Sequence, residues 1–163
     1  YVSGEEVLYL GRRYVLKVLK GDTHRGAVKL KGNRLEVPSL SGSPESVSAG
    51  VWAWYRVKAR DYFDRRLAEW EQKLPWVSSR PPFRLQEMEK RWGSCTPDGT
   101  IILNPHLIKA PRECIDYVIL HELAHLRHHN HSPEFWNTIN FADPDWQRKK
   151  ALLDGAAEQL TAK

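Results

Sequence analysis

Residues 121–131 read His-Glu-Leu-Ala-His-Leu-Arg-His-His-Asn-His, and this run constrains the chain more than any other feature. It begins with the pattern H-E-x-x-H, whose fixed positions are His121, Glu122 and His125. On an α-helix, four residues correspond to about 400° of rotation and roughly 6 Å of rise. His121 and His125 are therefore expected on one helix face, where both imidazoles can bind one metal ion. Glu122 lies about 100° around the helix, placed to reach a water molecule at the metal rather than the metal itself.

A catalytic zinc site needs a third protein ligand, and several residues after this motif are candidates. His128 would face the same way as His121, but roughly 10.5 Å further along a continuous helix. We therefore expect His128 and His129 beside the site or in solvent. The carboxylates of Glu134 and Asp145 are reserve ligands.

His131 is the third ligand that we favour, because the chain is expected to turn just before it. Asn130 tolerates the left-handed conformation that ends helices. Ser132 and Pro133 are residue types that begin a new helix. One helix is predicted to stop near 129 and another to start at 133, with His131 in the corner between them.

The predicted chemistry is hydrolysis. Zinc with three protein ligands lowers the pKa of a bound water to roughly 7 and polarises a carbonyl oxygen. Glu122 can take the proton of that water during attack and return it to the leaving group. Zinc is the expected cofactor, with nickel, cobalt and manganese as substitutes, since imidazole binds all of them.

Several short segments of the chain are similar to one known family: 91–95, 102–104, 110–111, 116–126, 130–136 and 144–146. They resemble the YgjP-like predicted metal-dependent hydrolases, distant relatives of the SprT-type and WLM zinc peptidases. The resemblance is specific over 84–153 and looser over 5–75. It implies that His121, His125 and His131 are the metal ligands and that Glu122 is the catalytic acid/base. Members of this family usually carry more chain before the position of Tyr1, which implies that part of the N-terminal sheet is missing here.

The predicted fold class is α+β, with a small antiparallel sheet beside a helical layer that contains the zinc-binding H-E-x-x-H helix. One metallohydrolase domain is expected over residues 1–163, a length that allows a hydrophobic core. We expect a strand-rich part at 1–43, a long helix at 44–75, and a hairpin plus metal-binding helical core at 83–163.

More detailed predictions follow from turn and cap signals. Residues 6–19 and 26–37 each favour two strands joined by a tight turn. A second hairpin is expected between 83–92 and 100–103, around the turn signal Thr96-Pro97-Asp98-Gly99. Three further helices are predicted, a short one after Asn104-Pro105, the metal helix at 112–128, and a last helix from Pro144 to about Thr161.

The segment Arg91-Trp92-Gly93-Ser94-Cys95 has two interpretations. In the functional one, Arg91 or Ser94 lies near the metal and stabilises oxyanion charge or binds a substrate carboxylate or phosphate. In the structural one, Trp92 packs in the core and Gly93 permits a bulge. We favour the structural interpretation, with Arg91 as the exception and the second catalytic candidate. Cys95 is not expected to ligate the metal, because a fourth protein ligand would close the site.

Other polar residues receive weaker predictions. Glu134 and Asp143 are candidates to orient a ligand histidine through its second ring nitrogen. His106 is expected either in solvent or, if it faces the cleft, as an extra proton donor. Asp116 is expected at the helix surface.

Charge and cysteine content limit the partners. The net charge of +5 permits contact with nucleic acid, but an ordinary solvated basic surface explains it equally well. Nothing approaches a 20-residue apolar stretch, so no membrane partner is expected. Two cysteines do not form a disulfide framework, and a cytoplasmic location is the expectation.

The predicted function is zinc-dependent hydrolysis of a peptide or protein substrate. Such a substrate would lie extended along a strand edge supplied by the hairpin at 83–104. Three alternatives stay open. They are a metal-dependent hydrolase of nucleotides or another phosphoanhydride, a DNA-associated SprT-like protease, and a binding module that uses zinc only to hold its fold.

Overall fold

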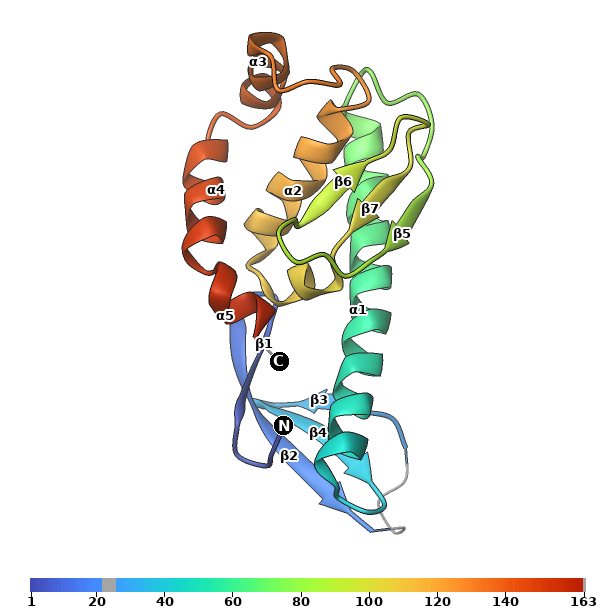
Figure 1. The fold of residues 1–163 in the computed structure, drawn as a ribbon, viewed down its shortest axis with the longest axis vertical. Helices are drawn as coiled ribbons and strands as arrows, with labels where there is room; N and C mark the ends of the chain where they lie inside the picture. The colour runs from blue at the N-terminus through green and yellow to red at the C-terminus, as the bar shows by residue number, and fades with distance from the viewer. Residues whose placement is uncertain (22–25, 163) are drawn as a thin grey trace.

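The protein is described by a computed structural model covering residues 1–21 and 26–162, so residues 22–25 of the expected strand-rich part lie outside the description, as does 163. Two small β-sheets lie towards opposite ends of one long helix, α1 (Pro44–Lys73), and further helices lie beside the second sheet (Figure 1). The predicted α+β class, with small sheets beside a helical layer, is confirmed.

The first sheet has the strand order β1-β2-β4-β3. Its strands are β1 (Glu6–Tyr9), β2 (Arg12–Lys20), β3 (Lys29–Lys31) and β4 (Arg34–Ser39). The pairs β1–β2 and β3–β4 are the two predicted hairpins. However, β2 and β4 run parallel, so the prediction of a purely antiparallel sheet is wrong. The reason is that β3 takes the outer edge, which leaves β4 beside β2 in the same direction.

The second sheet has the order β5-β7-β6, with β5 (Phe83–Leu85), β6 (Gly93–Cys95) and β7 (Ile101–Leu103). The predicted turn at 96–99 joins β6 to β7 in antiparallel register, but the predicted first strand at 83–92 is wrong. Instead, β5 pairs in parallel with the other side of β7.

The amide of Asn104 explains why the residues between β5 and β6 leave the sheet. Its Nδ2 donates to the carbonyl of Met88 at 2.8 Å and to that of Arg91 at 3.0 Å. These bonds hold residues 86–92 away from β7, so on that side of β7 only the short strand β6 pairs with it.

Helix α1 forms where the sequence predicts it. The hydroxyl of Ser43 caps it by accepting from the Ser46 amide at 3.2 Å, and Pro44 occupies the first turn. The predicted apolar positions are buried: Val47, Val51, Trp54, Tyr62, Leu67, Trp70 and Leu74. Because α1 contacts β4, β5 and the helix that carries the histidines, it connects both ends of the molecule.

The short 3-10 helix η1 (Pro105–Lys109) leads into α2 (Arg112–Ala124), the helix of the H-E-x-x-H motif. The first sheet attaches to this junction, since the Leu10 and Gly11 amides donate to carbonyls of η1 at 2.9 and 3.0 Å. Gly11 has φ 79°, and a Cβ there would lie 2.9 Å from Cα of Pro111. Only glycine therefore allows this close approach.

The C-terminal part consists of α3 (Pro133–Ala142), α4 (Trp146–Gly155) and α5 (Ala157–Thr161). The predicted last helix is broken at Ala156, whose amide bonds to the Leu153 carbonyl in a tighter turn. The break lets α5 bury Leu160 and contact η1. No helix in the described ranges is both long and apolar enough to cross a bilayer.

Candidate active site

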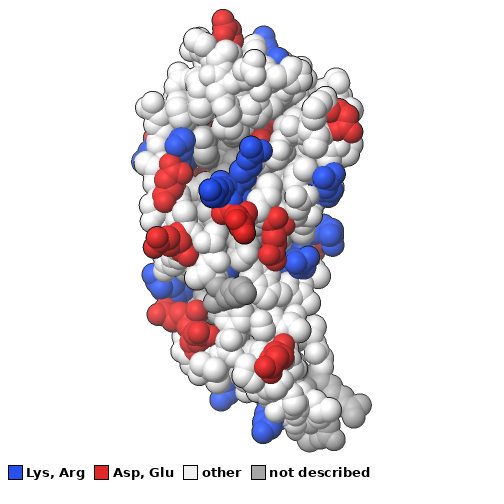
Figure 2. All heavy atoms as spheres, in the orientation of Figure 1, with Lys and Arg blue, Asp and Glu red and all other residues white. Residues whose placement is uncertain are grey.

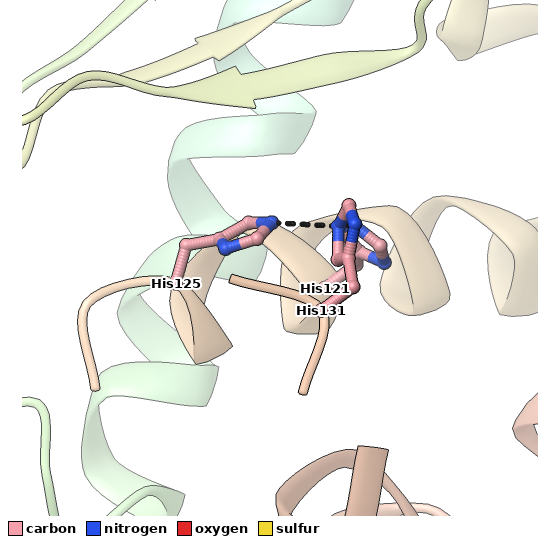
Figure 3. Close-up of side chains that lie close together, drawn as sticks. All are labelled: His121, His125 and His131. Carbon is pink, nitrogen blue, oxygen red and sulfur yellow. Dashed lines mark hydrogen bonds between the residues drawn. The ribbon is translucent and has the colours of Figure 1, made fainter. Parts of the chain in front are cut away.

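Three imidazoles converge at the C-terminal end of α2 (Figure 3). Nε2 of His131 lies 3.1 Å from Nε2 of His125 and 3.2 Å from Nε2 of His121. The structure therefore brings together the three residues that the sequence predicted as metal ligands. The reserve ligands Glu134 and Asp145 are not part of this group.

The convergence depends on where α2 ends. His121 lies in the last turn, and His125 is the C-cap, so the helix stops earlier than the predicted 128. A hydrogen bond of 2.9 Å from the His128 amide to the Ala124 carbonyl closes one more turn. The hydroxyl of Ser132 then caps α3 by accepting from the Phe135 amide at 3.3 Å. His131 consequently sits in the corner between α2 and α3, where the cap pattern predicted it.

Two aromatic side chains of α3 support the imidazoles. The ring of Phe135 is fully buried, with its centroid 5.0 Å from His121, 4.6 Å from His125 and 5.0 Å from His131. Trp136 stacks on His131 at 5.7 Å. The apolar packing fixes the ring planes and leaves the nitrogens directed at one another.

Two of the three nitrogen–nitrogen separations match those around a tetrahedral metal ion. Zinc–nitrogen bonds of about 2.0–2.1 Å place two ligand nitrogens about 3.3 Å apart in a tetrahedron. The observed separations of 3.1 and 3.2 Å are close to this value. Burial, together with His125 and His131, lowers the pKa of His121 to about 3. The imidazole is then neutral at physiological pH, as metal binding requires.

The second ring nitrogens have partners that sequence reasoning missed. Nδ1 of His125 lies 3.1 Å from the His128 carbonyl oxygen, and Nδ1 of His121 lies 3.5 Å from the Tyr117 hydroxyl. Tyr117 is four residues before His121, so the i,i+4 rule could have identified it.

The orienting role predicted for Glu134 and Asp143 is wrong. Glu134 is exposed, in the first turn of α3. Asp143 accepts from the Lys149 ammonium at 2.8 Å and from the Asp145 amide at 3.1 Å. The Asp143 carboxylate is occupied at the end of α3, and other groups face the second ring nitrogens of His121 and His125.

Glu122 is buried between α2 and β6, with 6% of its surface exposed. Burial raises the pKa of its carboxyl to about 8, and Arg91 opposes part of that rise. The side chain nevertheless borders the same cleft as the histidines.

The cleft has a volume of about 530 Å³ and runs between β6 and α4 over the surface of α2. On the β6 side it is lined by Arg91, Trp92, Gly93, Ser94 and Cys95, and on the α4 side by Lys150, Leu153 and Asp154. Tyr117 and Val118 of α2 contribute below the histidines, and His129 lies at its border.

The segment 91–95 both lines the cleft and contacts the core. Trp92 is half-buried and packs against the core, while Arg91 is exposed at the cleft. Burial and the neighbouring Glu122 raise the pKa of the Cys95 thiol to about 11. A protonated thiol is a poor nucleophile and a poor metal ligand. Cys95 and Cys114 are both free.

Two weaker predictions are wrong. His106 is buried, 4.6 Å from the Trp52 ring and with Nδ1 3.3 Å from the Lys109 ammonium, and it does not line the cleft. Asp116 is half-buried rather than at the surface, because Arg66 of α1 binds it through two hydrogen bonds of 2.8 and 3.1 Å.

Comparison with known proteins agrees with this geometry. The model of the family "YgjP-like, metallopeptidase domain" matches residues 1–156. The search of curated proteins found no match.

Two solved structures are similar in fold. The metallopeptidase zymogen abylysin of Pyrococcus abyssi aligns with a TM-score of 0.52 and 24% identity, covering 62% of this chain and 97% of its own. The metallopeptidase zymogen jannalysin of Methanocaldococcus jannaschii aligns with a TM-score of 0.52 and 19% identity, covering 58% and 96%. At these identities the likeness shows the fold alone. Since the family model spans nearly the whole chain, this protein is a metal-dependent hydrolase that belongs to the YgjP-like metallopeptidase family.

Proposed function

We propose that this protein is a zinc peptidase in which His121, His125 and His131 hold the ion and Glu122 transfers protons. The observation that carries this proposal is the mutual approach of the three Nε2 atoms at 3.1 and 3.2 Å beside a buried glutamate. In the described part of the chain, no fourth His, Cys, Asp or Glu joins the group. An open fourth position favours a catalytic over a structural site.

Glu122 is the acid/base in this proposal. When bound, zinc lowers the pKa of a coordinated water and polarises the substrate carbonyl. The Glu122 carboxylate accepts the proton of the attacking water and delivers it to the leaving amine. The burial of its side chain beside the cleft supports this assignment, because a poorly solvated carboxylate has a raised proton affinity.

The substrate is proposed to be an extended peptide bound along β6. Strand β6 packs against α2 and borders the cleft, and within the described residues only β7 pairs with it. Its other edge is therefore open to an added strand. Arg91, at the start of this edge, is placed to stabilise oxyanion charge in the cleft.

Charge distribution favours a peptide over a nucleotide or DNA-bound substrate. Lys150 at the cleft pairs with Asp154 at 2.8 Å, which leaves Arg91 as the other basic lining residue rather than a phosphate-binding cluster. On the face shown in Figure 2, basic and acidic side chains alternate without a continuous basic surface.

Metal analysis by mass spectrometry on untagged wild-type, His131→Ala and Glu122→Gln proteins tests the proposal, together with digestion of fluorescein-labelled casein. We expect near-stoichiometric zinc in the wild type and in Glu122→Gln, loss of zinc in His131→Ala, and casein cleavage by the wild type alone. Full zinc retention in His131→Ala would show that the third ligand is wrong. Undiminished casein cleavage by Glu122→Gln would refute the role of Glu122.

A further inference from the structure

Strand β6 approaches α2 so closely at Gly93 that a side chain there would have to displace the side chain of Glu122. A Cβ at this position would lie 2.9 Å from Cγ of Glu122, 3.0 Å from its Oε2 and 3.1 Å from Cγ1 of Val118. Gly93 does not adopt a positive φ. The absence of a side chain at Gly93 therefore leaves room for the Glu122 side chain, and the backbone conformation does not itself call for glycine.

The strand has little freedom to retreat from this contact. Gly93 pairs with Leu103 of the central strand β7, and Leu103 is fully buried. The next amide, that of Asn104, donates to the Trp92 carbonyl at 2.9 Å and extends the pairing. Any group added at Gly93 would consequently press on the Glu122 side chain before it moved the strand.

We propose that Gly93 is a positioning residue, whose bare backbone forms the wall that holds the Glu122 carboxylate in place beside the histidine cluster. The proposal rests on the proton-transfer role assigned to Glu122 above. Gly93 acts on the reaction through Glu122, apart from the backbone pairing of β6 with the substrate proposed above. The three atoms nearest to the added Cβ belong to Glu122 and Val118 and not to a histidine, so the metal ligands are spared.

The Gly93→Ala protein is expected to keep its zinc and lose catalytic rate. A displacement of the acid/base by about 1 Å is enough to lower the rate by about 10²-fold. With a fluorescence-quenched peptide taken from a casein cleavage site, we expect kcat to fall by about this factor and KM to stay within about twofold. The matched control is Gly155→Ala, because a Cβ at Gly155 meets nothing within 4 Å and this glycine also has no positive φ.

A second variant shows whether Gly93→Ala lowers kcat by displacing Glu122 or by displacing strand β6. Val118→Ala, added to Gly93→Ala, removes the aliphatic contact but leaves the contact with Glu122. If Gly93 acts through Glu122, the double variant regains thermal stability and kcat stays low. If kcat recovers with the second change, the loss came from displacement of the strand and the proposal is overturned.

Three further outcomes distinguish failure of the positioning role from failure of the proposed function. An unchanged kcat in Gly93→Ala, or loss of zinc from it, overturns the positioning role. If Glu122→Gln is inactive while Gly93→Ala is fully active, this inference fails and the proposed function stands. If Glu122→Gln is fully active, the proposed function itself fails.

Discussion

Two carboxylates on the same helix, Asp116 and Glu122, have opposite environments. Asp116 is matched by the Arg66 guanidinium through two hydrogen bonds, and Trp70 Nε1 donates to it at 3.3 Å. Glu122 is buried more deeply, its pKa is raised by that burial, and it borders a cleft. A carboxylate that is paired with a cation and hydrogen-bonded contributes to stability. A carboxylate in a poorly solvating site has a high proton affinity, which suits an acid/base in catalysis. On one helix, Asp116 therefore has an environment suited to stability and Glu122 has one suited to the acid/base role proposed above.

The largest expected effect is that of Glu122→Gln on activity. The amide keeps the shape of the side chain and cannot accept a proton, so the rate of casein cleavage is expected to fall by about 10²- to 10⁴-fold. The free energy of unfolding, measured by urea titration, should not decrease. A clear loss of stability would mean that Glu122 resembles Asp116, and the contrast between them would be lost.

Asp116→Asn should produce the reverse pattern. Loss of the charge weakens the half-buried bonds to Arg66, and we expect a destabilisation of about 1–3 kcal/mol. Activity per folded molecule, measured at a temperature well below the unfolding transition, should remain near that of the wild type. A large fall in kcat with normal stability would assign Asp116 to the site.

Tyr117→Phe tests a contact made by a residue that lies between these two acids in the sequence, since the Tyr117 hydroxyl lies next to His121, one of the proposed metal ligands. Removal of the hydroxyl at 3.5 Å from Nδ1 of His121 is expected to weaken zinc affinity by about 10-fold. Competition with a chromophoric chelator measures this change. An unaltered zinc affinity would show that packing alone orients the ring.

Lys109 is a buried cation, in contrast to the two carboxylates of α2. Its ammonium lies 4.9 Å from the Trp52 ring and 5.2 Å from the Tyr55 ring, and donates to the Ala162 carbonyl at 2.9 Å. Burial lowers the pKa of Lys109 from 10.5 to about 8. The unfolded chain therefore binds this proton more tightly, and the cost of burying the charge is present in full below pH 8.

The resulting pH dependence is the smallest predicted effect. Wild-type stability should rise between pH 8 and 10.5 relative to that of Lys109→Met, by about 1 kcal/mol or more. Urea unfolding at pH 7.5 and pH 10 measures the difference between the two proteins. Parallel pH profiles would indicate that the aromatic rings and the Ala162 carbonyl fully compensate the burial.

The sequence by itself determined the features that depend on neighbouring residues. The H-E-x-x-H spacing places His121 and His125 one helical turn apart, and the Ser132-Pro133 cap accounts for the turn that carries His131. The two hairpins of the first sheet and the limits of α1 also follow from local turn and cap signals. Such signals are readable because helix and turn geometry repeats within a few residues.

Only the tertiary structure decided the remainder. The parallel pairing of β5 with β7, the bond from Arg66 to Asp116 and the contact of Gly93 with Glu122 all join residues far apart in the chain. Local periodicity carries no information about such pairs, because they depend on which surfaces meet when the elements pack. The chain sequence thus predicts the residues that can bind a metal, while packing decides which groups contact their second ring nitrogens and the Glu122 side chain.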